Sequence, residues 1–331
     1  MFLPVYNLYG QKKRYDMEYE YLGNTDLKVS KLCFGSLTIS PLQSNLTIDE
    51  GVKVIHRAFD KGVNFIDTAE LYENYDYIKN ATEGIRNDII ISTKCYAYSK
   101  EGAENSLKKA LKELNREYID IFSLHEQESE HTIKGHWEAI EYFQKAKDKG
   151  YIRAFGISTH NVAAMEASLK YKEIEVLHPI YNKAGLGIID GSIDDMKIAI
   201  KMAYDEGKGI YSMKPLGGGN LLKETEDCIK FVMNNKNIHS IAIGMQSKEE
   251  VDFNTAIFEG RQPDNNLKDK LRNKKRRLLI DFWCEGCGDC AKACSQKAIT
   301  IINDKALVDE KKCVLCGYCS RYCKNFCIKV I

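Results

Sequence analysis

The chain has 331 residues, with 48 Lys and Arg against 47 Asp and Glu, so its net charge is +1. Hydrophobic residues make up 44% and charged residues 29%, which excludes a disordered chain. The balanced charge predicts neither a nucleic-acid partner nor a membrane partner. No apolar run reaches the roughly 20 residues that span a bilayer. Residues 1–16 lack the apolar core of a signal peptide, so we expect a cytoplasmic protein.

A short hairpin is expected first, with strands at 19–22 and 28–29 around a Gly-Asn turn. From about residue 31 to residue 260, a unit of apolar strand, turn and amphipathic helix then recurs. The predicted strands are 32–35, 64–68, 89–93, 119–124, 153–158, 176–180, 210–213 and 240–243. The predicted helices are 47–62, 74–83, 103–114, 135–149, 161–169, 194–206, 225–234 and 247–258.

Eight strands that alternate with eight helices predict an α/β fold, a (β/α)8 TIM barrel over residues 17–260, after an N-terminal extension at 1–16. A doubly wound open sheet is the alternative. It is less favoured because no glycine-rich dinucleotide fingerprint follows the first strand.

Residues 261–282 are strongly basic and predict a solvated helical linker. Residues 261–283 hold eight Lys and Arg against three Asp, centred on a Lys-Lys-Arg-Arg run. A docking surface for an acidic electron-transfer partner is the alternative. A nucleic-acid site would need a wider basic face or stacking aromatic residues.

The cysteines are concentrated at the C-terminal end, with nine of the twelve in the last 48 residues. In a chain expected to stay in a reducing compartment, such density favours metal binding over disulfides. The motif C-x2-C-x2-C-x3-C occurs twice, 29 residues apart, and Gly288 matches Gly317 between the copies.

This frame resembles a bacterial ferredoxin with two [4Fe–4S] clusters, which implies a small α+β ferredoxin-like iron–sulfur domain at 283–331. In that family the fourth cysteine lies on the following helix and serves the other cluster. The implied ligands are Cys284, Cys287, Cys290 and Cys323 for cluster 1, and Cys313, Cys316, Cys319 and Cys294 for cluster 2. Two structural zinc sites are the alternative. Cys327 is expected to be a packed side chain, and Ser295 and Lys324 stand where the family usually has proline.

Four ionisable residues follow consecutive strands of the predicted barrel: Asp67, Tyr72, Lys94 and His125. Active sites of such barrels lie at the carboxyl ends of the strands. Reduction of a carbonyl needs a proton as hydride arrives, and a tyrosine could donate it. We expect Lys94 to lower the pKa of Tyr72, Asp67 to hold Lys94, and His125 to orient the carbonyl oxygen.

At this point the chain resembles the aldo-keto reductase superfamily over about residues 19–260. The motifs that carry the resemblance are YLGNTDLKVSKLCFG, GVNFIDTAELY, STK, YIDIFSLH, IRAFGIST, KPLGGG and IAIGMQSKEEV. With its tail, the chain resembles the aldo-keto reductase-like oxidoreductases that carry a C-terminal 4Fe–4S domain. The resemblance implies reduction of a small carbonyl substrate with NAD(P)H, whose pyrophosphate would lie along residues 216–219. The implied cofactor-binding residues are Ser158, Thr159, His178, Met213, Lys214, Leu216, Gly218, Gly219, Gly244, Gln246, Ser247, Lys248 and Asn254.

The sequence departs from the family pattern around the nicotinamide. His178 replaces the usual Gln, Met213 replaces an aromatic residue, and Glu250 replaces the base that grips the 2′-phosphate. A carboxylate beside a phosphate predicts little preference for NADPH and a lean toward NADH. No flavin fingerprint is present.

Three functions remain open from the sequence. The first is a carbonyl reductase whose clusters exchange electrons with a redox protein partner. The second is an electron-transfer protein whose barrel binds another cofactor or partner and whose tetrad is vestigial. In the third, the clusters only stabilise a tail that is too small to build a core.

Overall fold

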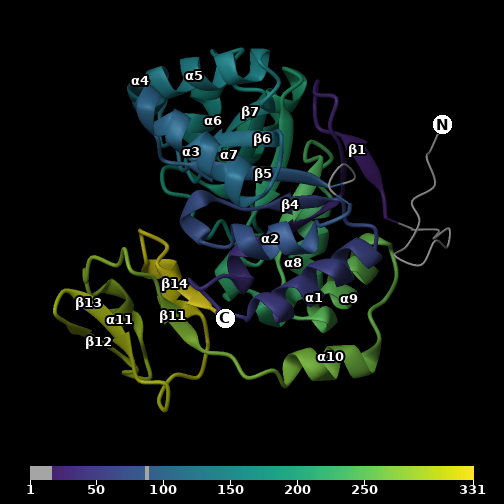
Figure 1. The fold of residues 1–331 in the computed structure, drawn as a ribbon. Helices are drawn as coiled ribbons and strands as arrows, with labels where there is room; N and C mark the ends of the chain where they lie inside the picture. The colour runs from purple at the N-terminus through teal and green to yellow at the C-terminus, as the bar shows by residue number, and fades with distance from the viewer. Residues whose placement is uncertain (1–16, 86–88) are drawn as a thin grey trace.

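The computed structural model describes residues 17–85 and 89–331, so the expected extension at 1–16 lies outside the described residues. Eight parallel strands form a closed barrel in the order β10-β3-β4-β5-β6-β7-β8-β9 (Figure 1). The barrel strands are β3 (Leu32–Gly35), β4 (Phe65–Asp67), β5 (Ile90–Cys95), β6 (Ile119–Leu124), β7 (Ile152–Thr159), β8 (Val176–Pro179), β9 (Gly209–Met213) and β10 (Ser240–Gly244). This barrel confirms the predicted fold and excludes the open sheet.

Amphipathic helices surround the barrel, and each buries an apolar stripe against the strands. As the sequence predicts, α1 begins with a capping box between Thr47 and Glu50. Within the described part of the chain, no helix is both long and apolar enough to span a membrane. The helices are α1 (Ile48–Asp60), α2 (Tyr75–Ala81), α3 (Lys100–Glu113), α4 (Glu130–Gly135), α5 (Trp137–Asp148), α6 (Val162–Ser168), α7 (Ile193–Asp205), α8 (Thr225–Met233) and α9 (Lys248–Phe258).

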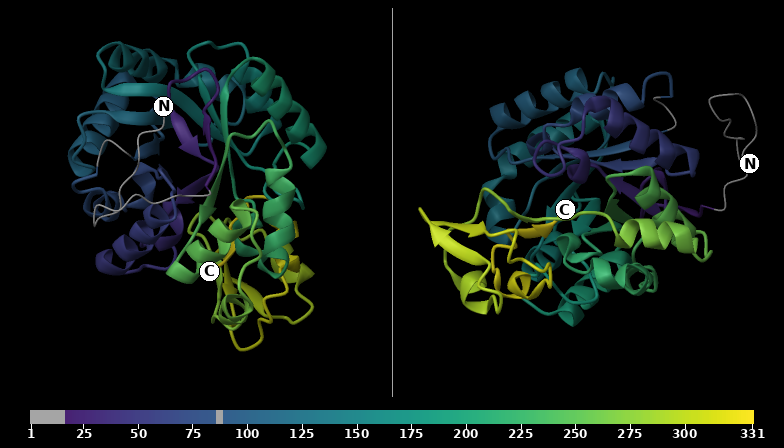
Figure 2. Two further views of the ribbon diagram at one scale, coloured as in Figure 1. Left: turned by 90° about the vertical axis from the view of Figure 1, so that its right-hand side faces the viewer. Right: turned by 90° about the horizontal axis from the view of Figure 1, so that it is seen from below.

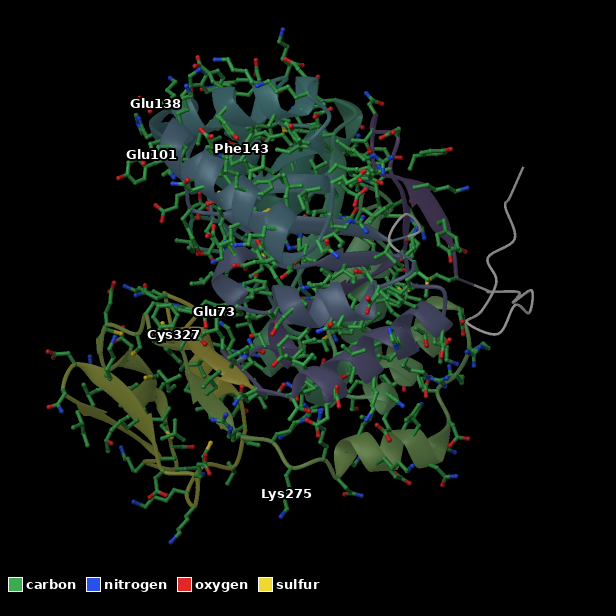
Figure 3. All side chains as sticks on the ribbon, viewed as in Figure 1. Glu73, Glu101, Glu138, Phe143, Lys275 and Cys327 are labelled. Atoms are coloured by element: carbon green, nitrogen blue, oxygen red, sulfur yellow. The ribbon has the colours of Figure 1, made fainter. Side chains whose placement is uncertain are left out.

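The main core lies between the strands and the helices. Phe143 on α5, labelled in Figure 3, stacks on Phe122 and Phe155 of neighbouring strands at 4.7 and 5.5 Å between ring centroids. A second cluster closes the amino ends of the strands, where the hairpin β1 (Tyr19–Tyr21) and β2 (Lys28–Ser30) covers the barrel interior. The carboxyl ends of the strands are therefore the open end.

The C-terminal module is a small α+β unit joined to the barrel by α10 (Asn265–Arg272). Its β11 (Leu278–Ile280) pairs antiparallel with β14 (Ile328–Val330), and β12 (Ile299–Ile302) pairs with β13 (Lys305–Val308). Residues 278–280 therefore belong to the module. The prediction of a linker over all of 261–282 was wrong at β11. This strand forms by pairing with β14, which lies 50 residues further along the chain, so the local sequence pattern does not reveal it.

The module covers the open end of the barrel, opposite the hairpin (Figures 1 and 2). Its strand β14 lies on the loop after β9, where Asn220 Nδ2 donates to the Ile328 carbonyl at 3.0 Å. A Cβ at Gly219 would collide with the Val330 carbonyl oxygen. The glycines at 217–219 therefore let β14 approach, whereas the sequence suggested that they make room for a pyrophosphate.

We expect Gly219→Ala to weaken the docking of the module onto the barrel. Gly219 has a φ of +85°, and Gly260 has a φ of +69° with no atom near the place of a Cβ. Alanine at either position adopts a left-handed conformation at a cost of about 1 kcal/mol, but only Gly219→Ala must also displace β14. The free energy of unfolding of the Gly219→Ala variant should be lower than that of wild type by about 2–4 kcal/mol. Equal losses in Gly219→Ala and Gly260→Ala, measured by urea unfolding, would contradict this packing role.

Candidate active site and cysteine loops

A buried ion pair lies at the carboxyl ends of two neighbouring barrel strands. Asp67 ends β4, and Lys94 lies beside it on β5. The Lys94 Nζ lies 2.8 Å from Oδ1 and 2.9 Å from Oδ2 of Asp67, and it also donates to the Thr68 carbonyl at 2.7 Å. The two side chains are 1% and 6% exposed, so each charge depends on the other for compensation.

Tyr211 on β9 holds this carboxylate from the other side of the barrel. Its Oη donates to Asp67 Oδ1 at 2.9 Å and also bonds Ser92 Oγ at 2.7 Å. His178 stacks on the Tyr211 ring at 3.9 Å, and its Nδ1–H donates to the Tyr211 carbonyl. Burial lowers the pKa of His178 to about 4, so the ring is neutral. The sequence analysis missed Tyr211 and Ser92, although both lie on predicted strands.

Tyr72 and His125 lie above the ion pair. Tyr72 ends a short 3₁₀ turn at Glu70–Tyr72, and its ring centroid is 5.2 Å from Lys94 Nζ. His125 follows β6, meets the Tyr72 ring edge-on at 5.8 Å, and stacks on Tyr96 at 4.6 Å. The structure therefore gathers the four residues that the sequence places at strand ends.

The electrostatic effect on Tyr72 differs from the expectation. Burial raises the pKa of the Tyr72 hydroxyl well above its ordinary value, and the charge of Asp67 raises it further. The expected net lowering of this pKa is therefore absent, because burial and Asp67 outweigh any stabilisation of the phenolate by Lys94. Burial, together with the charges of Lys94 and Lys214, also lowers the pKa of His125, which is neutral. Tyr72 therefore keeps its proton and is a donor.

A cavity of about 860 Å³ opens beside these residues, large enough for a dinucleotide and a small substrate. Asp67 and Tyr72 line its inner end, whereas Lys94 and His125 are not among the lining residues. Most of the cofactor-binding candidates also line it: His178, Met213, Lys214, Leu216, Gly218, Gly219, Gly244, Gln246 and Asn254.

Four of the cofactor-binding candidates lie outside the cavity wall, and the side chains of three of them have local partners. Ser158 Oγ accepts from the Glu126 N–H at 2.9 Å, and Thr159 Oγ1 accepts from the Asn161 N–H at 2.8 Å. Ser247 caps α9, and Lys248 is the first residue of that helix. Buried loop contacts explain Ser158 and Thr159 without a ligand, and the helix cap explains Ser247.

The basic segment after α10 contributes cations to the far end of the cavity. Lys274 Nζ and Arg276 Nη2 lie 2.8 and 3.2 Å from the same oxygen of Glu250. All three line the cavity, whereas Lys275 between the two cations points into solvent (Figure 3). The sequence analysis missed Lys274 and Arg276 as cavity residues because it treated the segment as solvated.

The cysteine loops of the module have matching backbones. Gly288 and Gly317 adopt φ values of +83° and +78° directly before α11 (Asp289–Ala293) and the 3₁₀ turn at Tyr318–Tyr322. The third cysteine of each run lies on the helical turn, and the fourth follows it in extended conformation. The expectation that the fourth cysteine lies on the helix was therefore wrong by one residue.

The cysteines gather in two groups. Burial raises the pKa of Cys290, and so do the charges of its nearby thiols, Cys323, Cys284 and Cys287. The other group lines one small cavity and consists of Cys294, Cys313, Cys316 and Cys319. Backbone N–H groups donate to Cys294 Sγ at 3.3 Å and to Cys323 Sγ at 3.2 Å. Among residues 17–85 and 89–331, no three His, Cys, Asp or Glu side chains are arranged to hold a metal ion.

The chain is similar to known oxidoreductases over the barrel. The model of the aldo/keto reductase family matches residues 31–259. The chain is 26% identical to L-galactose dehydrogenase of Arabidopsis thaliana, covering 72% of this chain and 88% of that protein. It is also 26% identical to the aldo-keto reductase YhdN of Bacillus subtilis (strain 168), over 50% of this chain and 54% of the relative.

A solved aldo-keto reductase from Bacillus halodurans, in its holo form, superposes with a TM-score of 0.64 at 22% identity. The superposition covers 77% of this chain and 95% of that structure. At this identity the likeness shows the fold alone. The family match ends at residue 259, before the cysteine loops begin.

We expect Lys94→Met to destabilise the fold because it leaves the Asp67 charge buried without its cation. The free energy of unfolding at pH 7 should fall by about 3–5 kcal/mol, as when one partner of a buried pair is removed. The matched control is Lys94→Met combined with Asp67→Asn, which removes both charges and should recover most of the loss. A double variant less stable than Lys94→Met in urea unfolding would show that the pair is not coupled.

Proposed function

Because the chain belongs to the aldo/keto reductase family, whose members are NAD(P)H-dependent oxidoreductases, we propose that it reduces a small carbonyl compound with NAD(P)H. The observation that carries this proposal is the buried Asp67–Lys94 pair beneath Tyr72, at the inner end of the 860 Å³ cavity. The pair places a fixed ammonium directly beneath a tyrosine that can donate a proton into the cavity.

Each residue of the site has a distinct proposed role. Tyr72 donates its proton to the carbonyl oxygen as the carbonyl carbon accepts a hydride. A bound NAD(P)H supplies that hydride when it lies in the cavity. The Lys94 ammonium, fixed by Asp67, stabilises the phenolate that Tyr72 leaves behind. Neutral His125, edge-on to the Tyr72 ring, orients the carbonyl oxygen by a hydrogen bond.

The structure changes the expected choice between the two nicotinamide dinucleotides. Glu250, the residue that suggested NADH, accepts hydrogen bonds from Lys274 and Arg276. Two cations against one carboxylate leave a net positive charge at this end of the cavity. The electrostatic reason to favour NADH over NADPH is therefore removed, and the proposal names NAD(P)H without a preference.

The eight framed cysteines are proposed to hold two [4Fe–4S] clusters. The donor set fits this group, because each set of four gathers one cysteine from the other loop, as the crossed pattern requires. The N–H donors on Cys294 and Cys323 would stabilise ligated thiolates. A cubane also spaces its thiolates more widely than one Zn²⁺ does, because each thiolate binds a different iron.

Exchange of electrons with a redox protein partner is the proposed role of these clusters. One cysteine of each loop, Cys287 and Cys316, is exposed at the module surface, where a partner could approach. A cubane bound at either loop would therefore lie near solvent.

We expect Tyr72→Phe to lower carbonyl reduction by about 10²–10⁴-fold, because it removes the proton donor and little else. The matched control is Tyr75→Phe, which also removes a single hydroxyl; that hydroxyl bonds Thr93 and lies outside the cavity wall. The control should keep its turnover, measured as NAD(P)H oxidation with a panel of aldehydes. If Tyr72→Phe turned over every tested carbonyl as fast as wild type, the reductase proposal would fail.

Anaerobically purified protein should contain about eight iron and eight inorganic sulfide per chain, because two cubanes hold that number. Cys323→Ser should lose about half of each, whereas Cys327→Ser, at a cysteine outside the frame, should keep all of them. Iron and sulfide analysis with visible absorption measures this. Stoichiometric zinc without sulfide would overturn the cluster proposal and favour structural zinc.

A further inference from the structure

Lys214 lines the cavity without a carboxylate partner. It follows β9 with a left-handed φ of +58°, and its Nζ lies 2.7 Å from His160 Nε2. Burial lowers the pKa of His160 well below its usual value, so this imidazole is a neutral acceptor. An ammonium has three N–H donors, and the imidazole uses one of them. Two donors of Lys214 are left for another group.

The other buried cations near Lys214 are already compensated. Lys94 pairs with Asp67, and Lys329 of the C-terminal module lies 3.5 Å from Asp281. In the described part of the chain, no carboxylate lies within ion-pair distance of Lys214 itself. Of these three buried amino groups, Lys214 is therefore the one without a carboxylate in contact among the described residues.

The remaining charge that faces this end is on Glu126, which is exposed and accepts from Tyr96 Oη at 2.7 Å. Histidines do not change the balance, because burial lowers the pKa of both His125 and His178. Burial lowers the pKa of the Lys214 amino group, and the charge of Glu126 opposes this shift without an ion-pair contact. An anion bound directly to Lys214 would compensate the buried ammonium.

The C-terminal module brings a second amino group close to Lys214. Phe326 packs between two ammonium groups, with Lys329 Nζ 3.5 Å and Lys214 Nζ 5.1 Å from its ring centroid. Burial lowers the pKa of Lys329 to about 7, and the charge of Lys214 contributes to the shift. An anion on Lys214 would relieve this repulsion.

We propose that Lys214 binds a carboxylate of the substrate, so that the enzyme reduces an oxo acid to the corresponding hydroxy acid. This inference rests on the proposed function. In the reaction, the carbonyl carbon gains hydride from NAD(P)H, its oxygen gains the Tyr72 proton, and the dinucleotide leaves oxidised. The carboxylate is unchanged and keeps the carbonyl oriented toward Tyr72.

The cofactor pyrophosphate is a second source of the same anionic chemistry. The groups near Lys214 favour the substrate, because they are His160, Phe326 and, at longer range, His125 on the catalytic side. The glycines first expected to accommodate the pyrophosphate, Gly218 and Gly219, pack against Lys329 and Val330 of the module instead. The experiment below separates the two sources.

The test compares pyruvate, acetoacetate and succinic semialdehyde, each against its methyl ester, in wild type, Lys214→Gln and Lys214→Arg. Wild type should prefer at least one acid over its ester, and Lys214→Gln should reduce that preference about 10- to 100-fold, mainly through KM. Lys214→Arg, which keeps the charge, should retain part of it. Lys223→Gln, at an exposed cavity lysine, should match wild type.

Calorimetric titration with oxamate, an unreactive analogue, gives a readout that does not need turnover. Oxamate should bind the cluster-loaded protein with saturating NAD⁺, and Lys214→Gln should weaken that binding at least about tenfold. If Lys214→Gln lost affinity for NADPH but kept the wild-type preference for an acid over its ester, Lys214 would be assigned to the cofactor pyrophosphate. That result would overturn the inference. The inference is also overturned if the wild-type protein neither binds oxamate nor prefers an acid to its ester. Reduction of the esters that still depends on Tyr72 would in that case leave the proposed reductase function standing.

Discussion

The buried ion pair between Asp67 and Lys94 is the interaction on which the site depends. Both side chains are almost fully excluded from water, so each needs the other, and Tyr211 from the opposite strand completes the coordination of the carboxylate. This arrangement requires β4, β5 and β9 to stay in register, so the closed barrel and the charge pair support each other. Burial, together with the charge of Asp67, keeps the nearby Tyr72 protonated.

The C-terminal module completes the open end of the barrel. At this end β14 packs against the loop after β9, and the preceding Phe326 meets the His160 ring. The three consecutive glycines of the loop after β9 let this strand approach, and a side chain at Gly219 would prevent it. The module therefore contributes side chains to the cavity as well as the cysteine loops, so the barrel site and the proposed clusters share one wall.

Charge is distributed unevenly along that wall. At the inner end, Lys214 contacts the neutral His160 and has no carboxylate partner among the described residues. At the outer end, Lys274 and Arg276 share the single carboxylate of Glu250. The cavity lining holds seven Lys and Arg against five Asp and Glu, although the whole chain is almost neutral. The cavity thus favours ligands that carry negative charge, as a dinucleotide with an anionic substrate does.

The sequence by itself determined the barrel, its strands to within two residues, and the four residues at the strand ends, because apolar periodicity and strand-end position are local properties. The cysteine spacing likewise indicated the two loops and their shared glycine conformation. Only the tertiary structure decided the parts that depend on distant partners. The pairing of β11 with β14, the contact of Tyr211 with Asp67, and the pairing of Lys274 and Arg276 with Glu250 all join segments that are far apart in the chain or belong to different elements. The raised pKa of Tyr72 also depends on the tertiary structure, because its main causes are burial and the nearby charge of Asp67.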